Sequence, residues 1–329
     1  MSFWANRNVL VTGCTGFLGR VLTVELIRRR ASVVGLVRDV VPRAPFFLDG
    51  VDRQITIVAG GVEDYFLLER TLADYEIDVA FHLAAQAIVP IANRNPRATF
   101  ETNIRGTWNL LEACRLVSGV SRVVVASSDK AYGAHSVLPY SEDHALQGSH
   151  PYDVSKSCAD LIATAYHRTY GTPVSVTRCG NLFGPGDLNF SRIVPGTIRS
   201  AFEGQRPVIR SDGSPVRDYI HVDDVVAGYL LLAERMEEED ARGRAFNFGT
   251  GEPLSVLDLT RRILALSHRE DLEPVILDEA RAEIQAQFLS NELARTRLAW
   301  RPGRSIGERL GETIAWYREY FARVGSAVV

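Results

Sequence analysis

Short apolar segments alternate with helical patterns through the first half of this 329-residue chain, and this alternation limits the folds open to it. Six segments are rich in β-branched and apolar residues and are expected to be strands: 8–12, 32–37, 54–58, 79–83, 122–126 and 174–178. A strand that is apolar along its whole length is buried on both faces, as in a parallel sheet covered by helices. The sequence therefore predicts an α/β fold built on a parallel sheet.

A glycine-rich turn follows the first expected strand and opens the first expected helix, at about 17–29. The turn reads Gly13-Cys14-Thr15-Gly16-Phe17-Leu18-Gly19. Glycines allow a tight turn and a close approach of the backbone, and the N–H groups of a helix N-terminus bind a pyrophosphate. Because the turn lies between a strand and a helix, it favours a Rossmann-type, doubly wound dinucleotide-binding sheet over an ordinary glycine-rich turn.

The character of the sequence changes after about residue 181. Gly and Pro become frequent at 182–186 and 213–215, which indicates loops, and 306–321 has the pattern of an amphipathic terminal helix. We therefore expect residues 1–180 to form the dinucleotide-binding domain, with some later segments returning to it. Residues 181–329 should form mainly a smaller C-terminal α/β domain that binds the substrate.

Composition excludes several classes of function. A net charge of -3 gives no support for binding to nucleic acid or to a membrane surface, and no apolar run is long enough to span a bilayer. The four cysteines are scattered without the paired spacing of a metal site, so no metal is expected. They are typical of reduced thiols in a cytoplasmic protein.

Only two of the 37 basic residues are lysines, Lys130 and Lys156. Arg stays charged at any working pH, whereas a desolvated Lys can lose its proton, so two retained lysines indicate lysine chemistry unless they are chance surface residues. Lys156 follows Tyr152 by four residues, which places both side chains on one face of a helix. A nearby ammonium favours the phenolate, so the pair can act as a general base with a positioned cation.

These motifs together resemble the extended short-chain dehydrogenase/reductase superfamily, and the resemblance covers nearly the whole chain. It implies that Tyr152 is the base, that Lys156 also holds the nicotinamide ribose, and that Ser128 hydrogen-bonds the substrate oxygen. The alternative for Ser128 is a turn hydroxyl at the end of a strand. The resemblance assigns the cofactor pocket to Gly13, Thr15, Gly16, Phe17, Leu18, Gly19, Leu83, Ala84, Ala85, Gln86, Asn103, Tyr152 and Lys156.

The choice between NAD and NADP depends on the end of the second expected strand, where an acid would bind the ribose of NAD. Val37 occupies that position, and Arg38 could meet a 2′-phosphate or stack on adenine. Asp39 could favour NAD if the loop shifts. Gly61 stands where the family often has an Asp that contacts adenine. The sequence leaves both cofactors open, with a slight preference for NADP.

Asp129 and Lys130 follow Ser128 and distinguish between branches of the superfamily. The Ser-Asp-Lys order resembles CDP-glucose 4,6-dehydratases, in which an acid and a base must work side by side. The resemblance makes Asp129 the candidate acid and Lys130 the candidate base. A purely structural ion pair is the alternative.

Three residues of the second half are candidates for binding the substrate diphosphate. Asn181, Arg192 and Arg217 lie in segments that resemble family segments for this role. Arg suits a diphosphate because its planar fork binds oxygens bidentately, although a chain with 35 arginines has many at its surface.

The leading interpretation is a nucleotide-sugar 4,6-dehydratase, with CDP-glucose as the first expected substrate and GDP-mannose as the next. The alternatives are a nucleotide-sugar 4-epimerase, which needs Ser128, Tyr152 and Lys156 alone, and an inactive NAD(P)-binding regulator. The resemblance also implies a homodimer.

Overall fold

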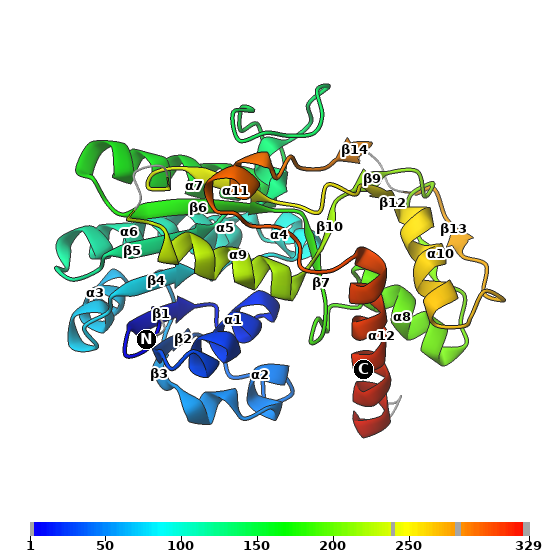
Figure 1. Cartoon of the computed structure of the whole chain (residues 1–329), viewed down its shortest axis with the longest axis horizontal. Helices are drawn as coiled ribbons and strands as arrows, with labels where there is room; N and C mark the ends of the chain where they lie inside the picture. Colours follow the sequence, from blue (N-terminus) through cyan, green and yellow to red (C-terminus); the bar gives the residue numbers. More distant parts are fainter. Residues whose placement is uncertain (1–2, 238–240, 280–283, 325–329) are drawn as a thin grey trace.

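The structure is a computed structural model that describes residues 3–237, 241–279 and 284–324. Its centre is a seven-stranded parallel sheet with the strand order β11-β6-β5-β4-β1-β2-β3 (Figure 1). The strands are β1 Asn8–Thr12, β2 Ser32–Val37, β3 Thr56–Ala59, β4 Val79–His82, β5 Arg122–Ala126, β6 Val174–Cys179 and β11 Ala245–Phe248. The order reverses between β1 and β4, which creates the crevice where such sheets bind ligands.

Helices cover both faces of this sheet. Within β1, Val9 and Val11 face one apolar cluster and Leu10 faces the other, as the two-residue period of a strand requires. Helices α1 and α9 contribute to the first cluster, and α3, α6 and α7 contribute to the second. Their bounds are α1 Phe17–Arg28, α3 Tyr65–Asp74, α6 Gly106–Leu116, α7 Pro151–Tyr170 and α9 Val222–Glu234.

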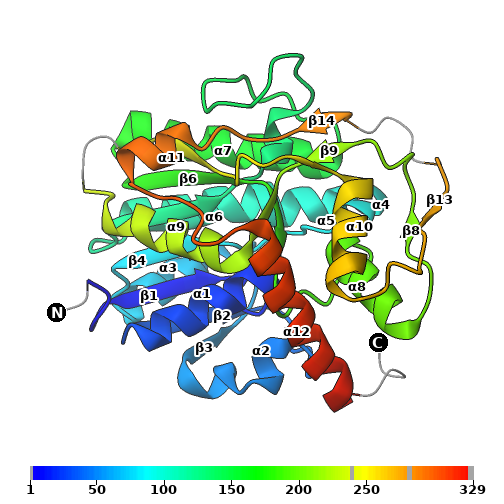
Figure 2. The ribbon, with the colours of Figure 1, turned by 45° about the vertical axis from the view of Figure 1, so that its right-hand side comes forward.

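Most of the second half forms a smaller unit beside the carboxyl edge of the sheet (Figure 2). Short strands form three small sheets, and α8, α10 and α12 pack around a separate core that includes Phe183, Leu259 and Leu310. The strands are β7 Asn181–Phe183, β8 Val208–Ile209, β9 Val216–Arg217, β10 Tyr219–His221, β12 Leu254–Ser255, β13 Val275–Ile276 and β14 Ala286–Gln287. The helices are α8 Ile193–Glu203, α10 Val256–Leu266 and α12 Ile306–Val324.

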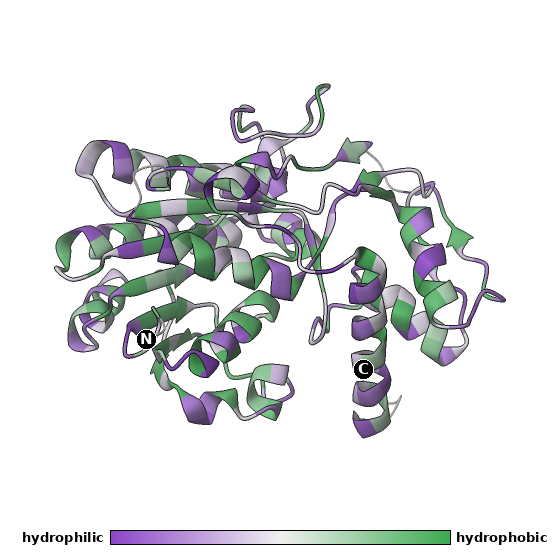
Figure 3. Ribbon diagram, in the orientation of Figure 1, coloured by the Kyte–Doolittle hydropathy of each residue, from purple (hydrophilic) through white to green (hydrophobic). Residues whose placement is uncertain are grey.

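The remaining elements are short. They are the α-helices α2 Pro45–Leu48, α4 Val89–Arg94, α5 Pro96–Phe100 and α11 Glu292–Arg297, the 3-10 turns η1 Val51–Gln54 and η3 Asp129–Tyr132, and the π-helical turn η2 Glu101–Arg105. Figure 3 shows that apolar and polar residues are interspersed along the helices. Within the described ranges, no helix has both the length and the apolar character needed to cross a membrane.

The predicted fold class is confirmed: the sheet is parallel, Rossmann-like and covered by helices, with a smaller C-terminal unit. Three predicted strands, β1, β2 and β5, have the predicted bounds. The third begins at Thr56 rather than Gln54, because 51–54 forms the turn η1. β11 was not among the predicted strands, and it returns from the second half to pair with β6. The domain boundary near residue 180 stays a prediction.

Truncating β11 should weaken the central sheet. Phe246 of β11 is fully buried, so Phe246→Ala should lower the free energy of unfolding by about 4 kcal/mol, through lost burial and an unfilled cavity. Urea unfolding followed by circular dichroism measures this change. Phe66 is 76% exposed, so Phe66→Ala is the matched control and should change stability by less than about 0.5 kcal/mol. Equal effects of the two substitutions would contradict the placement of β11.

Candidate active site

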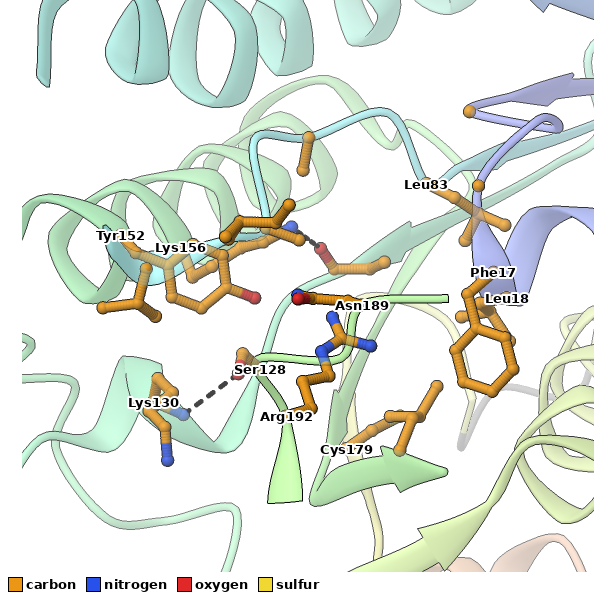
Figure 4. Close-up of a pocket in the computed structure, with 18 of the residues that line it drawn as sticks. Phe17, Leu18, Leu83, Ser128, Lys130, Tyr152, Lys156, Cys179, Asn189 and Arg192 are labelled. Atoms are coloured by element: carbon orange, nitrogen blue, oxygen red, sulfur yellow. Dashed lines mark hydrogen bonds between the residues drawn. The ribbon is translucent and has the colours of Figure 1, made fainter. Parts of the chain in front are cut away.

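A cavity of about 900 Å³ opens at the carboxyl ends of the central strands. One wall comes from the residues that follow β1, β4, β5 and β6, and the other comes from the smaller unit. Figure 4 shows Ser128 and Tyr152 facing the same space as Asn189 and Arg192. The cavity therefore lies at the position where the topology of the sheet predicts a ligand.

The structure brings most of the predicted site residues to this cavity. Those that line it are Gly13, Thr15, Gly16, Phe17, Leu18, Gly19, Arg38, Leu83, Ala84, Ala85, Ser128, Asp129, Lys130, Tyr152, Lys156, Asn181, Arg192 and Arg217. Sequence reasoning did not find several others, among them Glu63, Asp153, Cys179, Asn189 and Gln287. Four of them lie outside the Tyr152–Lys156 motif, and Asp153 lies at a position within it that the motif leaves open, so the spacing predicts a role for none of the five.

Two predicted cofactor residues, Gln86 and Asn103, do not line the cavity. The Asn103 side chain accepts a hydrogen bond from the Gln86 N–H at 2.7 Å and donates one to the Gln86 carbonyl at 3.2 Å. It also donates to the Ser155 hydroxyl of α7 at 2.9 Å. The Asn103 amide therefore links the segment after β4 to α7, and both of these elements contribute to the cavity wall.

The turn between β1 and α1 has the geometry of a dinucleotide cradle. Gly13 has a φ of +73°, and a Cβ there would lie 2.8 Å from the Ala84 nitrogen. A Cβ on Gly19 would overlap the carbonyl oxygen of Gly13, so α1 can approach the turn only without that side chain. No side chain caps the N-terminus of α1 at Gly16, which leaves its first N–H groups for an anion. These features fit the pyrophosphate of a dinucleotide.

The end of the cavity beside Arg38, where the sequence predicts the adenosine, carries more negative charge than the sequence suggests. Arg38 donates to Asp39 at 2.6 Å, so this guanidinium already has an anionic partner. A Cβ on Gly61 would overlap the carboxylate of Glu63, which shows that Glu63 fills the space that a side chain at Gly61 would take. Thr102 donates a hydrogen bond to Glu63 and holds it there.

Tyr152 and Lys156 lie on the first turns of α7 and face the cavity, as the four-residue spacing predicts. Desolvation raises the pKa of Tyr152 to about 12, and the neighbouring Ser128 hydroxyl opposes part of this rise. Lys156 was predicted to lower the pKa of Tyr152. The Lys156 ammonium instead donates to the Ala126 carbonyl at 2.7 Å and lies 6.0 Å from the centre of the Tyr152 ring. Desolvation also lowers the pKa of Lys156 to about 8.

Asp129 and Lys130 begin the turn η3 directly after β5 and are capped by Ser128. The Ser128 hydroxyl donates to Asp129 Oδ1 at 3.0 Å and accepts from the Lys130 N–H at 3.2 Å. Asp129 is buried, and its Oδ2 has no hydrogen-bond partner in the part of the chain that the structure describes. Lys130 Nζ lies 3.9 Å from that oxygen. An acid and a base therefore adjoin Ser128 at the cavity wall.

The smaller unit contributes cationic side chains to the opposite wall. Arg192 precedes α8 and pairs with the buried carboxylate of Asp187 at 3.0 Å. Arg217 of β9 is nearly buried, and Arg210 lines the same wall without having been predicted. Asn181 begins β7 and lines the cavity. This part of the cavity is suited to an anionic ligand.

The sheet and its glycine turn define a protein of the Rossmann class. The profile of the NAD dependent epimerase/dehydratase family matches residues 9–249, and the chain belongs to this family. The predicted superfamily resemblance is thereby confirmed.

Relatives in this family match almost end to end. The CDP-glucose 4,6-dehydratase of Salmonella typhimurium is 29% identical, over 97% of this chain and 92% of the relative. The dTDP-glucose 4,6-dehydratase structure from Streptomyces venezuelae, which has NAD bound, superimposes with a TM-score of 0.86 at 29% identity, over 96% of this chain and 98% of the other. The UDP-glucose 4-epimerase structure from Thermotoga maritima, with UDP-glucose, has a TM-score of 0.87 at 29% identity, over 95% and 99%.

Burial of Lys156 predicts a pH dependence of stability. A lysine in the unfolded chain titrates near 10.5, so between about pH 8 and 10.5 the unfolded state binds more protons than the folded state. The free energy of unfolding should therefore gain roughly 3 kcal/mol from this group as pH rises through that window. Urea unfolding of wild type and Lys156→Met at several pH values isolates this contribution. Parallel pH curves for the two proteins would rule it out.

Proposed function

We propose that this protein is a nucleotide-sugar 4,6-dehydratase, with CDP-glucose as the first substrate to test and GDP-mannose as the next. The observation that carries the proposal is the position of Asp129 and Lys130, which adjoin Ser128 and Tyr152 in one cavity. A 4-epimerase needs only the Ser, Tyr and Lys set. A 4,6-dehydratase also needs an acid and a base to remove the sugar's 6-hydroxyl.

The residues divide the chemistry between them. A bound NAD would accept a hydride from sugar C4 and return it to C6. Tyr152 takes the proton of the 4-hydroxyl while Ser128 hydrogen-bonds the same oxygen. Lys130 then removes the C5 proton, which the 4-ketone has acidified, and Asp129 gives a proton to the departing 6-hydroxyl, so that water leaves. Lys130 returns the proton to C5 as C6 is reduced, and the cofactor undergoes no net change. Tyr152 then releases its proton to water and Asp129 takes one up, so that both groups return to their starting forms.

The roles of the two lysines can be separated. In Lys130→Met, the exchange of the C4 hydrogen with the cofactor should persist, because Ser128, Tyr152 and Lys156 remain, while formation of the 4-keto-6-deoxy product should fall by about 10²–10⁴-fold. Mass spectrometry after incubation with CDP-glucose deuterated at C4 follows both steps, because deuterium appears in the cofactor in the first step and at C6 of the product in the second. Lys156→Met is the matched control, and it should lose both steps. Dehydration that survives in Lys130→Met would remove Lys130 from the mechanism.

We propose NAD as the cofactor. The slight sequence preference for NADP gains no support from the comparisons, since the family is NAD dependent and the dehydratase from Streptomyces venezuelae was solved with NAD. The pairing of Arg38 with Asp39 and the nearby carboxylate of Glu63 disfavour a 2′-phosphate.

Cofactor choice is open to direct measurement. Mass spectrometry of the dinucleotide released from purified protein should find NAD, and the Kd for NAD should be at least about tenfold lower than that for NADP. Asp39→Ala removes the carboxylate that pairs with Arg38. It should strengthen NADP binding and so reduce the difference between the two Kd values. Purified protein that releases mainly NADP would overturn the assignment.

Two alternatives remain distinguishable by their products. The structure of the UDP-glucose 4-epimerase from Thermotoga maritima, with its TM-score of 0.87, supports the 4-epimerase as the second candidate. A product that retains its 6-hydroxyl and is inverted at C4 would favour it. An inactive regulator would bind the dinucleotide and turn over none of a panel of nucleotide sugars.

We also propose that the protein is a cytoplasmic homodimer. Trp108 on α6 and Leu161 on α7 are 43% and 58% exposed, and these two helices pack side by side on the sheet. Light scattering should give twice the chain mass, and Trp108→Glu should shift the protein toward the monomer. A monomeric wild type would exclude the dimer.

The proposed cytoplasmic location rests on the four cysteines, which are all free.

A further inference from the structure

We propose that Gln287 is a positioning residue that holds Lys130 in place for removal of the C5 proton. This inference rests on the proposed dehydratase function. Gln287 lies on β14, 157 residues beyond Lys130 in sequence, and its side chain reaches the turn η3 from the smaller unit. Its place in the sequence gives no indication of such a role.

Both ends of the Gln287 amide bond the same dipeptide. Its Oε1 accepts from Lys130 Nζ at 2.5 Å, and its Nε2 donates to the Asp129 carbonyl at 2.9 Å. The side chain is 0% exposed. Because an ammonium can only donate and a carbonyl can only accept, these partners determine which way the amide points. A buried amide without such partners would be costly, so the two bonds lock the turn and the lysine together.

The neutrality of the amide matters for a base. An amide oxygen can accept an N–H from Nζ whether the lysine is charged or not, so it can orient the amine throughout the reaction. A carboxylate in the same place would stabilise the ammonium form and hold the proton that the base must lose. The ionisable groups that line the cavity with Lys130 include Asp129 in its own turn, His150, Tyr152 and Asp153 at the start of α7, and Arg192, Arg210 and Arg217 of the smaller unit.

The backbone of β14 links Lys130 to the substrate wall. Gln287 and Arg217 are partners in the parallel pairing of β14 with β9. Tyr140 holds the segment that follows β14. Its backbone N–H donates to the Phe288 carbonyl, and its carbonyl accepts from the Ser290 N–H. A diphosphate bound at Arg217 would therefore engage the same strand pair that orients the base.

The experiment compares two substitutions of Gln287 with a matched control. Gln287→Leu keeps much of the volume and removes both hydrogen bonds, and its dehydration rate should fall by about 10–100-fold because the amine is no longer held. Gln287→Glu keeps the shape and adds charge, so the acidic limb of the dehydration pH profile should move upward by about one pH unit. Gln285→Leu, at an exposed position next to β14, should behave as wild type.

Exchange of the C4 hydrogen with the cofactor is the second readout, since it depends on Tyr152 rather than Lys130. It should stay within about twofold of wild type in all three variants, and thermal unfolding checks that each variant is folded.

Three outcomes would overturn the proposal. The first is unchanged dehydration and an unmoved pH profile in the Gln287 variants. The second is an equal loss of C4 exchange and dehydration, which indicates a merely structural role. The third is a wild type that makes no 4-keto-6-deoxy product from any nucleotide sugar, and in that case the proposed function fails first. The wild-type measurement therefore separates the two failures.

Discussion

The contact between the turn after β1 and the segment after β4 is the constraint on which the rest of the site depends. Gly13 approaches Ala84 so closely that no side chain fits between them, and α1 must also pass over Gly13. This contact leaves the N-terminus of α1 facing the carboxyl edge of the sheet. β4, β5 and β6 then deliver their own terminal residues to the same edge. This arrangement forms one wall of the cavity, and the smaller unit forms the other.

The chemistry of the site depends on the burial of polar groups. Tyr152 and Lys156 both have their charged forms disfavoured by desolvation, and one oxygen of the buried Asp129 has no hydrogen-bond partner among the described residues. Such groups lower stability when nothing binds beside them, because a charge or a polar atom has been taken from water without full compensation. A bound cofactor and sugar can supply the missing partners, so the cost in the free protein is consistent with a site organised for ligands.

The local parts of the fold and site could be predicted from sequence, because periodicity and glycine spacing are local signals. The strands around the glycine turn, and the placing of Tyr152 and Lys156 on one helix face, are examples. The parts that depend on tertiary packing could not be predicted. β11 pairs with β6 from the far half of the chain, and Gln287 reaches Lys130 across 157 residues. The pKa of Tyr152 also differs from expectation, since desolvation outweighs a neighbouring cation whose position the sequence does not give.

The scarcity of lysine has a practical consequence. The chain has two lysines among its 37 basic residues, and both line the cavity, where the Lys156 residue is 6% exposed and the Lys130 side chain 24%. The exterior of the protein is therefore rich in guanidinium groups, which amine-directed reagents leave unmodified. Apart from the chain's own α-amino group, covalent labelling of amines would report only on this cavity. The extent to which the two lysines are labelled would therefore measure whether a ligand occupies the cavity.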